Sequence, residues 1–517
     1  MARPLGVVAA GHRCTAEAAA EVLRAGGNAY DAVLAALAAA CAAEPVLCTP
    51  GGGGFLLARP ADGAARVYDF FVQTPSERHA LEDIDFRPVL VDFGAVTQEF
   101  HIGLGTVAVP GMVRGLFEAH RELGSLPMRD IVAQAVTLAK EGVPVTPFQA
   151  YLFDVVKTTY GATDACRRIF ASSSIEGSLV REGDVLRQPE LADTLEILAH
   201  EGDDLFYRGE IAAAIERDMQ GEGQVTRADL AAYRVERRAP LTRDYRGVRV
   251  YTNPPPSSGG LLIAFGLELL ASQSLVGIEP GEARHLELLA RVLEATTEAR
   301  IAAHAEGASL AAEQLLDEAL LGRYRREIAG RLASRRGTTH MSVIDGAGNL
   351  ASLTVSNGEG SGYVVPGTGV VMNNMLGEED LNPGGFQRWQ AGQRMTSMMA
   401  PSALQWSDGT LVATGSGGSN RLRTAILQVI VNVIDFALPI EEAVRAPRIH
   451  FENGHLSVEG GFDVEQLGPL LDKFPNHQIW EDLNLFFGGA HTVRAQDDDM
   501  QGAGDPRRDG ASMVCVA

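Results

Sequence analysis

Cysteine is scarce in this chain and is never paired closely in sequence. The five cysteines among 517 residues are an odd number and include no Cys-x-x-Cys pair. A disulfide framework is therefore not expected, and buried or free thiols in a reducing compartment are the simpler interpretation. The cysteines are Cys14, Cys41, Cys48, Cys166 and Cys515.

Long apolar runs are also absent. The N-terminal apolar stretch is too short for a signal peptide, and no window free of charges reaches the length of a membrane span. The nearest candidate, Val33 to Ala43, is alanine-rich and short, which favours a buried helix. We therefore expect a soluble cytoplasmic protein that does not bind a membrane.

Positive charge is in deficit, because the formal net charge is −22 and the pI is near 5.0. Such an acidic surface repels phosphate backbones and anionic lipids, so neither nucleic acid nor a membrane is expected as a partner. Apolar residues make up 46% of the chain, as in ordinary globular proteins.

Motifs for metals and nucleotides are missing too. No HExxH or close set of histidines and carboxylates occurs, and the histidines considered as ligands are scattered. They are His79, His101, His285 and His304. The run Gly51 to Gly54 lacks the Lys-Ser/Thr of a phosphate loop. No metal and no cofactor are expected.

What the sequence does contain is a succession of helical patterns followed by short strands. Apolar spacing predicts helices at about Thr15–Arg24 (capped by Thr15), from Tyr30 onward, and at Met112–Leu123, Met128–Glu141, Gln188–His200, Glu282–His304, Leu310–Ser334 and Arg421–Phe436. Strands are predicted at Phe55–Ala58, Thr339–Asp345, Leu350–Val355 and Thr410–Thr414, and 85–105 is predicted as an irregular loop region.

Length alone would allow two to four domains, but this arrangement favours a layered α/β protein with one continuous core. There is no fixed-period repeat and no long linker of low complexity.

The segment with most chemical content is Gly337-Thr338-Thr339-His340, at the start of the predicted hairpin. Taken alone, these four residues are an ordinary loop-to-strand junction, and a structural role would be favoured. Their meaning depends on the motifs around them.

Ordered motifs over nearly the whole chain resemble those of the γ-glutamyltranspeptidase family. They are Gly26–Ala32, Pro110–Gly111, Pro254–Gly260, Thr338–Ser342, Gly367–Asn374, Thr414–Ser419, Ala446–His450 and Asp505–Gly510. The resemblance implies a four-layer αββα sandwich of the N-terminal-nucleophile type. It also implies that the chain cuts its own Gly337–Thr338 bond, leaving a large subunit (1–337) and a small catalytic subunit (338–517) that form one structural unit.

The physical logic of a nucleophilic Thr338 is independent of the family. A threonine hydroxyl is a poor nucleophile until a base removes its proton. Cleavage before Thr338 frees an α-amino group that titrates near 8 in model peptides, so nucleophile and base share one residue. His340 would lie on the same face of the strand, but no carboxylate nearby in sequence orients its ring, so packing or strand-end support is favoured for it.

An oxyanion requires backbone N–H donors, and a glycine-rich turn before a helix can supply them. Gly415 to Ser419 fits this need, although a tight strand-to-helix turn is an even alternative. The resemblance places the oxyanion hole at Gly418 and its neighbour, where the family usually has two glycines. Register gives Gly418 and Ser419, with Gly417 immediately before, and Ser419 can serve because only its N–H is required. It further implies that Ser356 and Asn357 orient the nucleophile and hold substrate, and that Ser397 matches one of two family serines, with Met398 in the place of the second.

Departures from the family concern the substrate. Phe71 stands where the family has an arginine that grips the substrate α-carboxylate, and phenyl cannot form that bidentate ion pair. Met375 and Glu378 stand where the family holds the α-amino group; Glu378 can pair an ammonium, whereas Met375 cannot accept in the same way. We therefore expect a retained reaction in a more apolar pocket, with glutathione a poor substrate.

The expected function is a self-processing N-terminal-threonine amidohydrolase or acyltransferase, γ-glutamyltransferase-like, acting through an acyl-enzyme. Its partners would be a small-molecule amide or γ-glutamyl substrate and a water or amine acceptor, and a homo-oligomer is possible. Two alternatives remain open: an acylase for other amides, such as cephalosporin-type side chains, and an uncleaved, non-catalytic family member that serves as a binding or scaffold protein.

Overall fold

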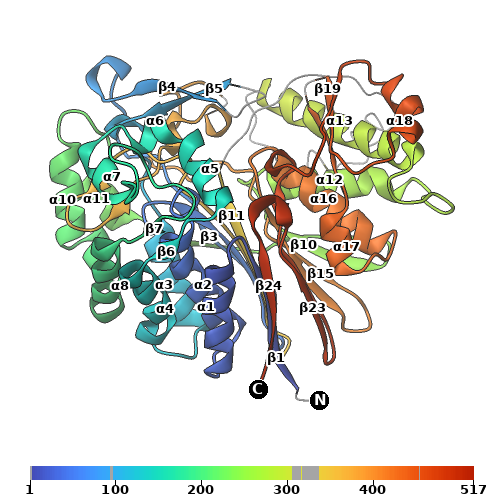
Figure 1. Ribbon diagram of the computed structural model, residues 1–517, viewed down its shortest axis with the longest axis horizontal. Helices are drawn as coiled ribbons and strands as arrows, with labels where there is room; N and C mark the ends of the chain where they lie inside the picture. The colour runs from blue at the N-terminus through green and yellow to red at the C-terminus, as the bar shows by residue number, and fades with distance from the viewer. Residues whose placement is uncertain (1–2, 93–96, 306–315, 317–336, 383, 453) are drawn as a thin grey trace.

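Two antiparallel sheets face each other at the centre of the molecule, and a layer of helices covers the outer face of each (Figure 1). The computed structural model describes residues 3–92, 97–305, 316, 337–382, 384–452 and 454–517. The four layers form an αββα sandwich, as the resemblance to the γ-glutamyltranspeptidase family implies. Gly337 is still joined to Thr338, so the structure is that of the uncut chain.

The first sheet mixes strands from both sides of Gly337. Its order is β24 (Ala511–Val516), β1 (Pro4–Ala10), β11 (Thr339–Asp345), β12 (Leu350–Ser356), β2 (Gly53–Arg59), β3 (Arg66–Phe70) and β8 (Glu236–Arg238). β1 pairs with β24 on one side and with β11 on the other. A cut after Gly337 would therefore leave both pieces hydrogen-bonded within one sheet.

The second sheet has six strands and packs on the first through β15, β16, β22 and β23. Its order is β23 (Asp499–Ala503), β22 (Thr492–Gln496), β16 (Leu411–Thr414), β15 (Ser402–Gln405), β10 (Val248–Thr252) and β9 (Leu241–Tyr245).

Helices of the N-terminal half cover the first sheet. The main ones are α1 (Arg13–Arg24), α2 (Ala29–Ala43), α3 (Met112–Leu123), α4 (Met128–Glu141) and α8 (Pro189–Glu201). Shorter helices complete this side: α5 (Pro147–Val155), α6 (Lys157–Tyr160), α7 (Asp164–Ile169), α9 (Asp204–Tyr207), α10 (Glu210–Met219) and α11 (Arg227–Ala232). Every residue of α2 is buried, as its alanine-rich sequence predicts.

Helices from later in the chain cover the second sheet. They are α12 (Gly259–Ala271), α13 (Ala283–Ala305), α16 (Arg421–Ile434), α17 (Ile440–Arg445) and α18 (Val464–Leu471). Small sheets lie around the sandwich: β4 (Arg87–Asp92) with β5 (Thr97–Ile102), β6 (Val143–Pro144) with β7 (Val185–Leu186), β13 (Val364–Val365) with β14 (Val370–Val371), β17 (Ser416–Gly417) with β21 (Gly489–Ala490), and β18 (Ile449–Glu452), β19 (His455–Val458) and β20 (His477–Ile479).

Strand alternation divides the core into layers. On β1, Val7 and Ala9 belong to the apolar cluster between the sheets, whereas Val8 and Ala10 belong to the cluster under the helices. On β11, Met341 faces the helices and Ile344 faces the other sheet. The period of two along a strand therefore decides which residues enter the space between the sheets.

The run Gly51 to Gly54 is a close-packing turn and strand start. A Cβ atom on Gly52 would lie 2.4 Å from the carbonyl oxygen of Ser356, and one on Gly54 would lie 2.5 Å from that of Thr354. No larger residue fits, because the obstructing atoms are backbone.

Two local predictions were wrong. The segment 85–105 contains the β4–β5 hairpin, with Val89 paired with Phe100, and is not an irregular loop. Helix α1 begins two residues before Thr15, because the His12 side chain accepts the N–H of Cys14 and caps it. The helix predicted at Leu310–Ser334 lies outside the described residues.

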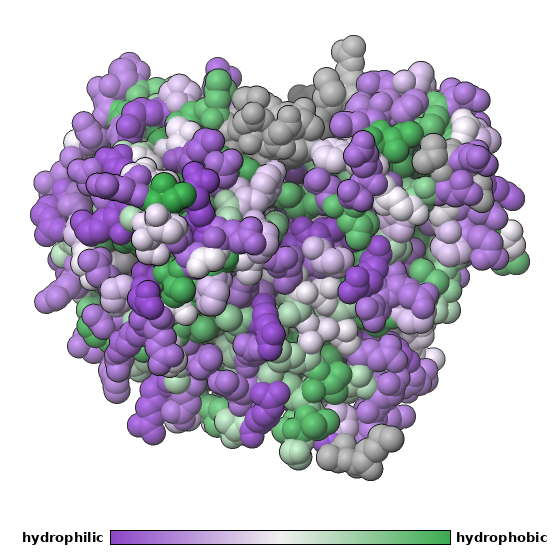
Figure 2. Space-filling model, in the orientation of Figure 1, coloured by the Kyte–Doolittle hydropathy of each residue, from purple (hydrophilic) through white to green (hydrophobic). Residues whose placement is uncertain are grey.

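The face shown in Figure 2 is dominated by hydrophilic residues, with hydrophobic ones scattered among them, in keeping with the net charge of −22. No helix in the described part of the chain combines the length and apolarity needed to cross a membrane.

Candidate active site

Thr338 lies immediately before β11, on the side that faces the second sheet. Thr339 pairs with Val355 of β12, and Thr339 turns toward the helices, where its hydroxyl donates to Glu44 Oε2 at 2.7 Å. Alternation therefore turns Thr338 toward the space between the sheets, on the same face as His340 and Ser356. Only 4% of Thr338 is exposed.

A pocket of about 560 Å³, counting space open to solvent, opens at Thr338. It gathers most of the residues that the sequence singles out, from segments far apart in the chain. These are Phe71, Gly337, Thr338, Ser356, Met375, Glu378, Ser397 and Ser419. The three remaining predicted residues, Asn357, Gly417 and Gly418, are not part of its lining.

The carbonyl oxygen of Gly337 accepts two hydroxyl groups. Thr338 Oγ1 donates to it at 2.7 Å, and Ser356 Oγ donates to it at 2.7 Å from the end of β12. The hydroxyl that would attack this carbonyl group is therefore already beside it, and a second hydroxyl fixes and polarises the same oxygen.

The next carbonyl group, that of Thr338, is held by Arg508. Arg508 Nη1 donates to Thr338 O at 3.2 Å, and burial lowers the pKa of Arg508 to about 10. Gly417 lies against the same carbonyl group, since a Cβ atom there would be 2.1 Å from Thr338 O. Gly417 thus lets the turn after β16 approach the main chain of Thr338, although it does not line the pocket.

This turn carries the donors expected for an oxyanion. Gly418 has φ +118°, and Ser419 has φ +53°, in the left-handed region that non-glycine residues seldom adopt. Within the described part of the chain, neither the Gly418 nor the Ser419 N–H donates to another protein group. The Ser419 hydroxyl is engaged elsewhere and donates to Asp380 at 3.1 Å.

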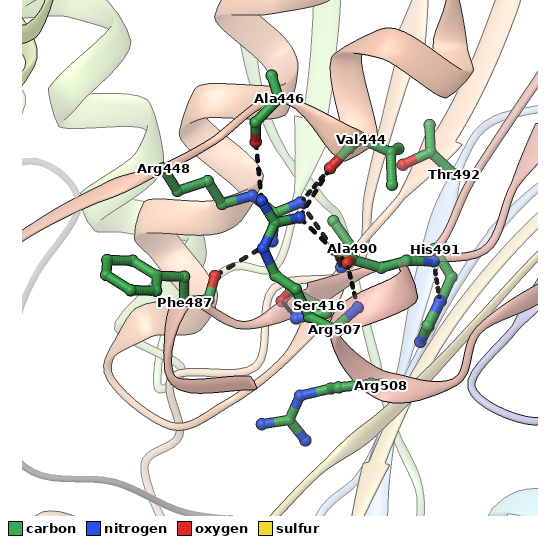
Figure 3. A network of polar contacts seen from close by, with 12 residues as sticks. Ser416, Val444, Ala446, Arg448, Phe487, Ala490, His491, Thr492, Arg507 and Arg508 are labelled. Carbon is green, nitrogen blue, oxygen red and sulfur yellow. Dashed lines mark hydrogen bonds and ion pairs between the residues drawn. The ribbon is translucent and has the colours of Figure 1, made fainter. Parts of the chain in front are cut away.

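A buried network of hydrogen bonds around Arg448 and Arg507 connects to the strand paired with the start of this turn (Figure 3). Asp505 Oδ2 accepts Arg448 Nη2 at 2.7 Å and the N–H of Ala490 at 2.8 Å. Ala490 belongs to β21, which pairs with β17 and so fixes the turn's first residues. Arg507 donates to Asp505 Oδ1 at 3.1 Å, whereas Arg508 is turned away from the network in Figure 3. The network thus joins two of the segments whose sequences resemble family motifs, those around Arg448 and Asp505.

His340 is engaged in packing. It is fully buried, with Nδ1 2.8 Å from Thr354 Oγ1 and Nε2 2.9 Å from Ser342 Oγ. Gly415 is pressed against its ring, because a Cβ atom there would lie 2.3 Å from it. Both ring nitrogens are thus satisfied by neighbouring strand residues, in agreement with the predicted strand-end support.

Acid should weaken the fold through the buried histidines. Burial lowers the pKa of His491 to about 4 and, with His491 close by, holds the pKa of His340 well below its ordinary value. The unfolded chain, with histidine pKa values near 6.5, binds more protons below that pH. The free energy of unfolding should therefore fall between about pH 6.5 and 4, by about 3 kcal/mol for His491 alone. Urea unfolding across this range measures the slope, and His340→Gln should flatten it; an unchanged slope in that variant would contradict the assignment.

One part of the pocket wall is apolar. Phe71 and Met375 are each about 1% exposed, and the Phe71 ring stacks on Phe55 with centroids 5.4 Å apart. Met398, Met399 and Leu422 also line the pocket. Acidic groups occupy another part of the wall, where Glu378 and Asp380 both contribute.

Asn357 faces away from the pocket. In the amide orientation that gives both its oxygen and its nitrogen suitable partners, the Asn357 nitrogen donates to the carbonyl oxygens of Val46 at 3.0 Å and Leu47 at 3.2 Å. Alternation along β12 explains this, because Ser356 faces Thr338 and the next residue must point to the other side.

Sequence reasoning missed several residues that contact the site. Glu44 accepts the hydroxyl groups of Thr15 and Thr339 at 2.7 Å each, and burial raises its pKa. Arg300 lines the pocket from α13 and is held by Glu452 at 2.6 Å. Glu359 accepts the N–H of Gly337 at 2.7 Å. No local pattern reveals such contacts, because they join distant parts of the chain.

An αββα sandwich with a threonine at the head of an inner strand, facing a pocket between the sheets, defines the class of N-terminal-nucleophile hydrolases. The family model described as gamma-glutamyltranspeptidase matches residues 15–515. The chain belongs to the γ-glutamyltranspeptidase family, whose members are self-processing amide hydrolases and acyltransferases.

Named relatives fall into two activity groups. The chain is 31% identical to a glutathione hydrolase proenzyme of Pseudomonas aeruginosa, over 98% of this chain and 94% of that protein. It is 33% identical to the acylase ACY 1 proenzyme of Pseudomonas sp. strain V22, over 98% and 93%. The crystal structure of cephalosporin acylase from Bacillus halodurans superposes with a TM-score of 0.85 at 27% identity, covering 100% of this chain and 97% of that one.

Proposed function

We propose that Thr338 is the nucleophile, that the chain cuts itself between Gly337 and Thr338, and that the mature enzyme transfers an acyl group from an amide to water or an amine. The observation that carries this proposal is the pair of hydroxyl groups, from Thr338 and Ser356, on the Gly337 carbonyl oxygen. The large fragment would be residues 1–337 and the small one 338–517.

Self-cleavage follows from this geometry. Attack of Thr338 Oγ1 on the Gly337 carbonyl carbon forms an ester while the C–N bond to Thr338 breaks, and the hydroxyl proton passes to the departing nitrogen. Water then hydrolyses the ester. The products are a carboxylate on Gly337 and a Thr338 with a free hydroxyl and a free α-amino group.

The same atoms serve turnover. The new α-amino group takes the hydroxyl proton as Thr338 attacks a substrate amide, and the amine leaves with that proton. Water or an acceptor amine then releases the acyl group from the Thr338 ester. The N–H groups of Gly418 and Ser419, which have no acceptor among the described residues, are suited to the developing oxyanion.

For the substrate, we favour an amide with an apolar acyl group over a γ-glutamyl compound. Phe71 and Met375 lie in the apolar part of the pocket wall, and neither can bind a carboxylate or ammonium group. The acylase ACY 1 proenzyme and the cephalosporin acylase, both similar to this chain, support the same choice.

A substrate panel tests this preference. We expect kcat/KM for N-acyl amides with apolar acyl groups to exceed that for γ-glutamyl-p-nitroanilide by roughly 30-fold or more, since a missing charge-paired contact in a desolvated site costs about 2 kcal/mol or more. Steady-state kinetics on one preparation of cleaved enzyme gives both values. Equal or faster turnover of the γ-glutamyl compound would contradict the preference while leaving the Thr338 chemistry intact.

We also propose that the protein works in a reducing compartment, the cytoplasm. All five cysteines are free, and Cys41 Sγ and Cys48 Sγ lie 3.6 Å apart as thiols. Cell fractionation tests this proposal.

A further inference from the structure

Gly337 is held at its nitrogen as well as at its carbonyl group. Its N–H donates to Glu359 Oε1 at 2.7 Å, and Glu359 is only 3% exposed. The space is tight, because a Cβ atom on Gly337 would lie 3.2 Å from Leu47 and 3.4 Å from Glu359 Oε1. A buried carboxylate thus contacts the residue just before the Thr338 nitrogen.

The turn after β12 directs Glu359 back toward Gly337. Gly358 and Gly360, on either side of it, have φ +68° and +75°, in the left-handed region that suits glycine. The N–H of Glu359 donates to Asn374 Oδ1 at 2.9 Å, and the Gly358 N–H donates to Ser356 Oγ at 3.0 Å. Glu359 and Ser356 therefore belong to one rigid turn that reaches both polar groups of Gly337.

We propose that Glu359 is a positioning residue for self-cleavage, acting on the N–H of Gly337. The proposal rests on the Gly337–Thr338 cleavage site proposed above. The hydrogen bond on which the proposal rests joins Glu359 to the N–H of Gly337, and not to the attacking oxygen or to the bond that breaks. It acts by fixing the residue that presents the carbonyl carbon.

A hydrogen bond that fixes the main chain restricts glycine more than any other residue. Without a side chain, Gly337 has more φ and ψ freedom than other residues, so it needs contacts from its surroundings to hold its carbonyl group beside the Thr338 hydroxyl. Glu359 on the nitrogen and Ser356 on the oxygen together restrict both torsions. Arg508 on the Thr338 carbonyl oxygen restrains the other side of the bond. Holding reacting atoms in an attack geometry is a major source of rate in intramolecular reactions.

The structure gives the neighbouring buried carboxylate, that of Glu44, a different set of contacts from that of Glu359. Glu44 is also buried near Thr338, but it accepts the hydroxyl groups of Thr15 and Thr339, which point toward the helices. Among the described residues, no hydrogen bond joins Glu44 to Gly337, whereas the Glu359 hydrogen bond exists only while Gly337 occupies its place. Glu359 should therefore matter for maturation more than for turnover.

The test compares Glu359→Ala with Glu359→Gln in the full chain. Self-cleavage is followed on denaturing gels after synthesis, and turnover is measured per cleaved molecule with the best amide of the panel. We expect Glu359→Ala to slow cleavage roughly 10- to 100-fold, the effect of losing a hydrogen bond to a charged group. Glu359→Gln keeps an acceptor oxygen and should restore most of the rate. Turnover per cleaved molecule should change less than about threefold in both variants, a difference of roughly 0.6 kcal/mol.

Glu176→Ala, at an exposed turn, controls for the loss of a glutamate. Cleavage of Glu359→Ala at the wild-type rate would overturn the proposal. So would equal slowing in the Gln and Ala variants accompanied by a lowered melting temperature, because that pattern indicates a purely structural role. Mass spectrometry of the small fragment keeps the two proposals distinct: a fragment that does not begin at Thr338 refutes the cleavage site, whatever the Glu359 variants do.

Discussion

Thr338→Ala is expected to leave the chain as one uncut polypeptide without amidase activity. The substitution removes the Thr338 hydroxyl group, which lies on the Gly337 carbonyl oxygen and is the proposed attacking group. Without the cut, residue 338 also has no free α-amino group to act as the base. Loss of both nucleophile and base should lower kcat/KM by about 10³-fold or more. A denaturing gel reads the first effect, and amide hydrolysis reads the second.

Thr338→Ser is the matched control for this variant. It keeps the hydroxyl group and loses only a methyl group, so it should still mature and turn over, at reduced rates. Two fragments with normal turnover from Thr338→Ala would show that another residue is the nucleophile.

Gly417→Ala is expected to have the second largest effect, lowering both maturation and turnover by roughly 100-fold or more. A Cβ atom at this position would lie 2.1 Å from Thr338 O and 3.0 Å from its carbonyl carbon. Both obstacles are backbone atoms, so the turn or the strand must move, and shifts of this size misalign the reacting groups. The same gel and kinetic assay measure the result.

Gly468→Ala is the control for adding a methyl group. Gly468 lies in α18 with no heavy atom within 4 Å of the added Cβ, so that variant should keep wild-type maturation. Circular dichroism and gel filtration establish that Gly417→Ala is folded. Normal maturation of a folded Gly417→Ala protein would refute the close contact with Thr338.

The fold could be read from the sequence where local patterns decide the structure. The predicted helices at Met112–Leu123 and Met128–Glu141 match α3 and α4 at both ends, because an amphipathic stripe is bounded by Pro or Gly on either side. The hairpin of β11 and β12 was also predicted, from the alternation of side chains along its strands and from the glycine-containing turn between them.

The prediction failed where strands are short or caps unusual. The Val89-Leu90-Val91 run is β-prone, but Pro88 beside it and the polar residues Thr97, Gln98 and Glu99 at the start of β5 weaken the pattern. At α1, a histidine supplies the cap instead of the preferred Thr15, whose hydroxyl bonds Glu44 29 positions away. A contact at that separation overrides a local preference.

Sequence motifs were enough to predict most residues of the candidate site, but not the residues that hold them in place. Thr338, Ser356 and the pocket residue Phe71 follow from sequence motifs, and the alternation of β12 alone could have separated Asn357 from them. Glu359 and Arg508 could not be found this way. Their partners lie 22 and 170 positions away, and only the packed sheets bring them together.

The Arg508 contact sets an order of events during synthesis of the protein. The guanidinium on the Thr338 carbonyl oxygen is supplied by a residue translated 170 positions later, and β24, which follows it, pairs with β1 from the start of the chain. A ribosome-bound chain that has just passed Thr338 thus lacks one of the contacts that restrain the bond proposed to be cut. Maturation should therefore begin only after the first and last strands of the sheet have met, so that the cut is made in a chain whose two pieces are already bound to each other.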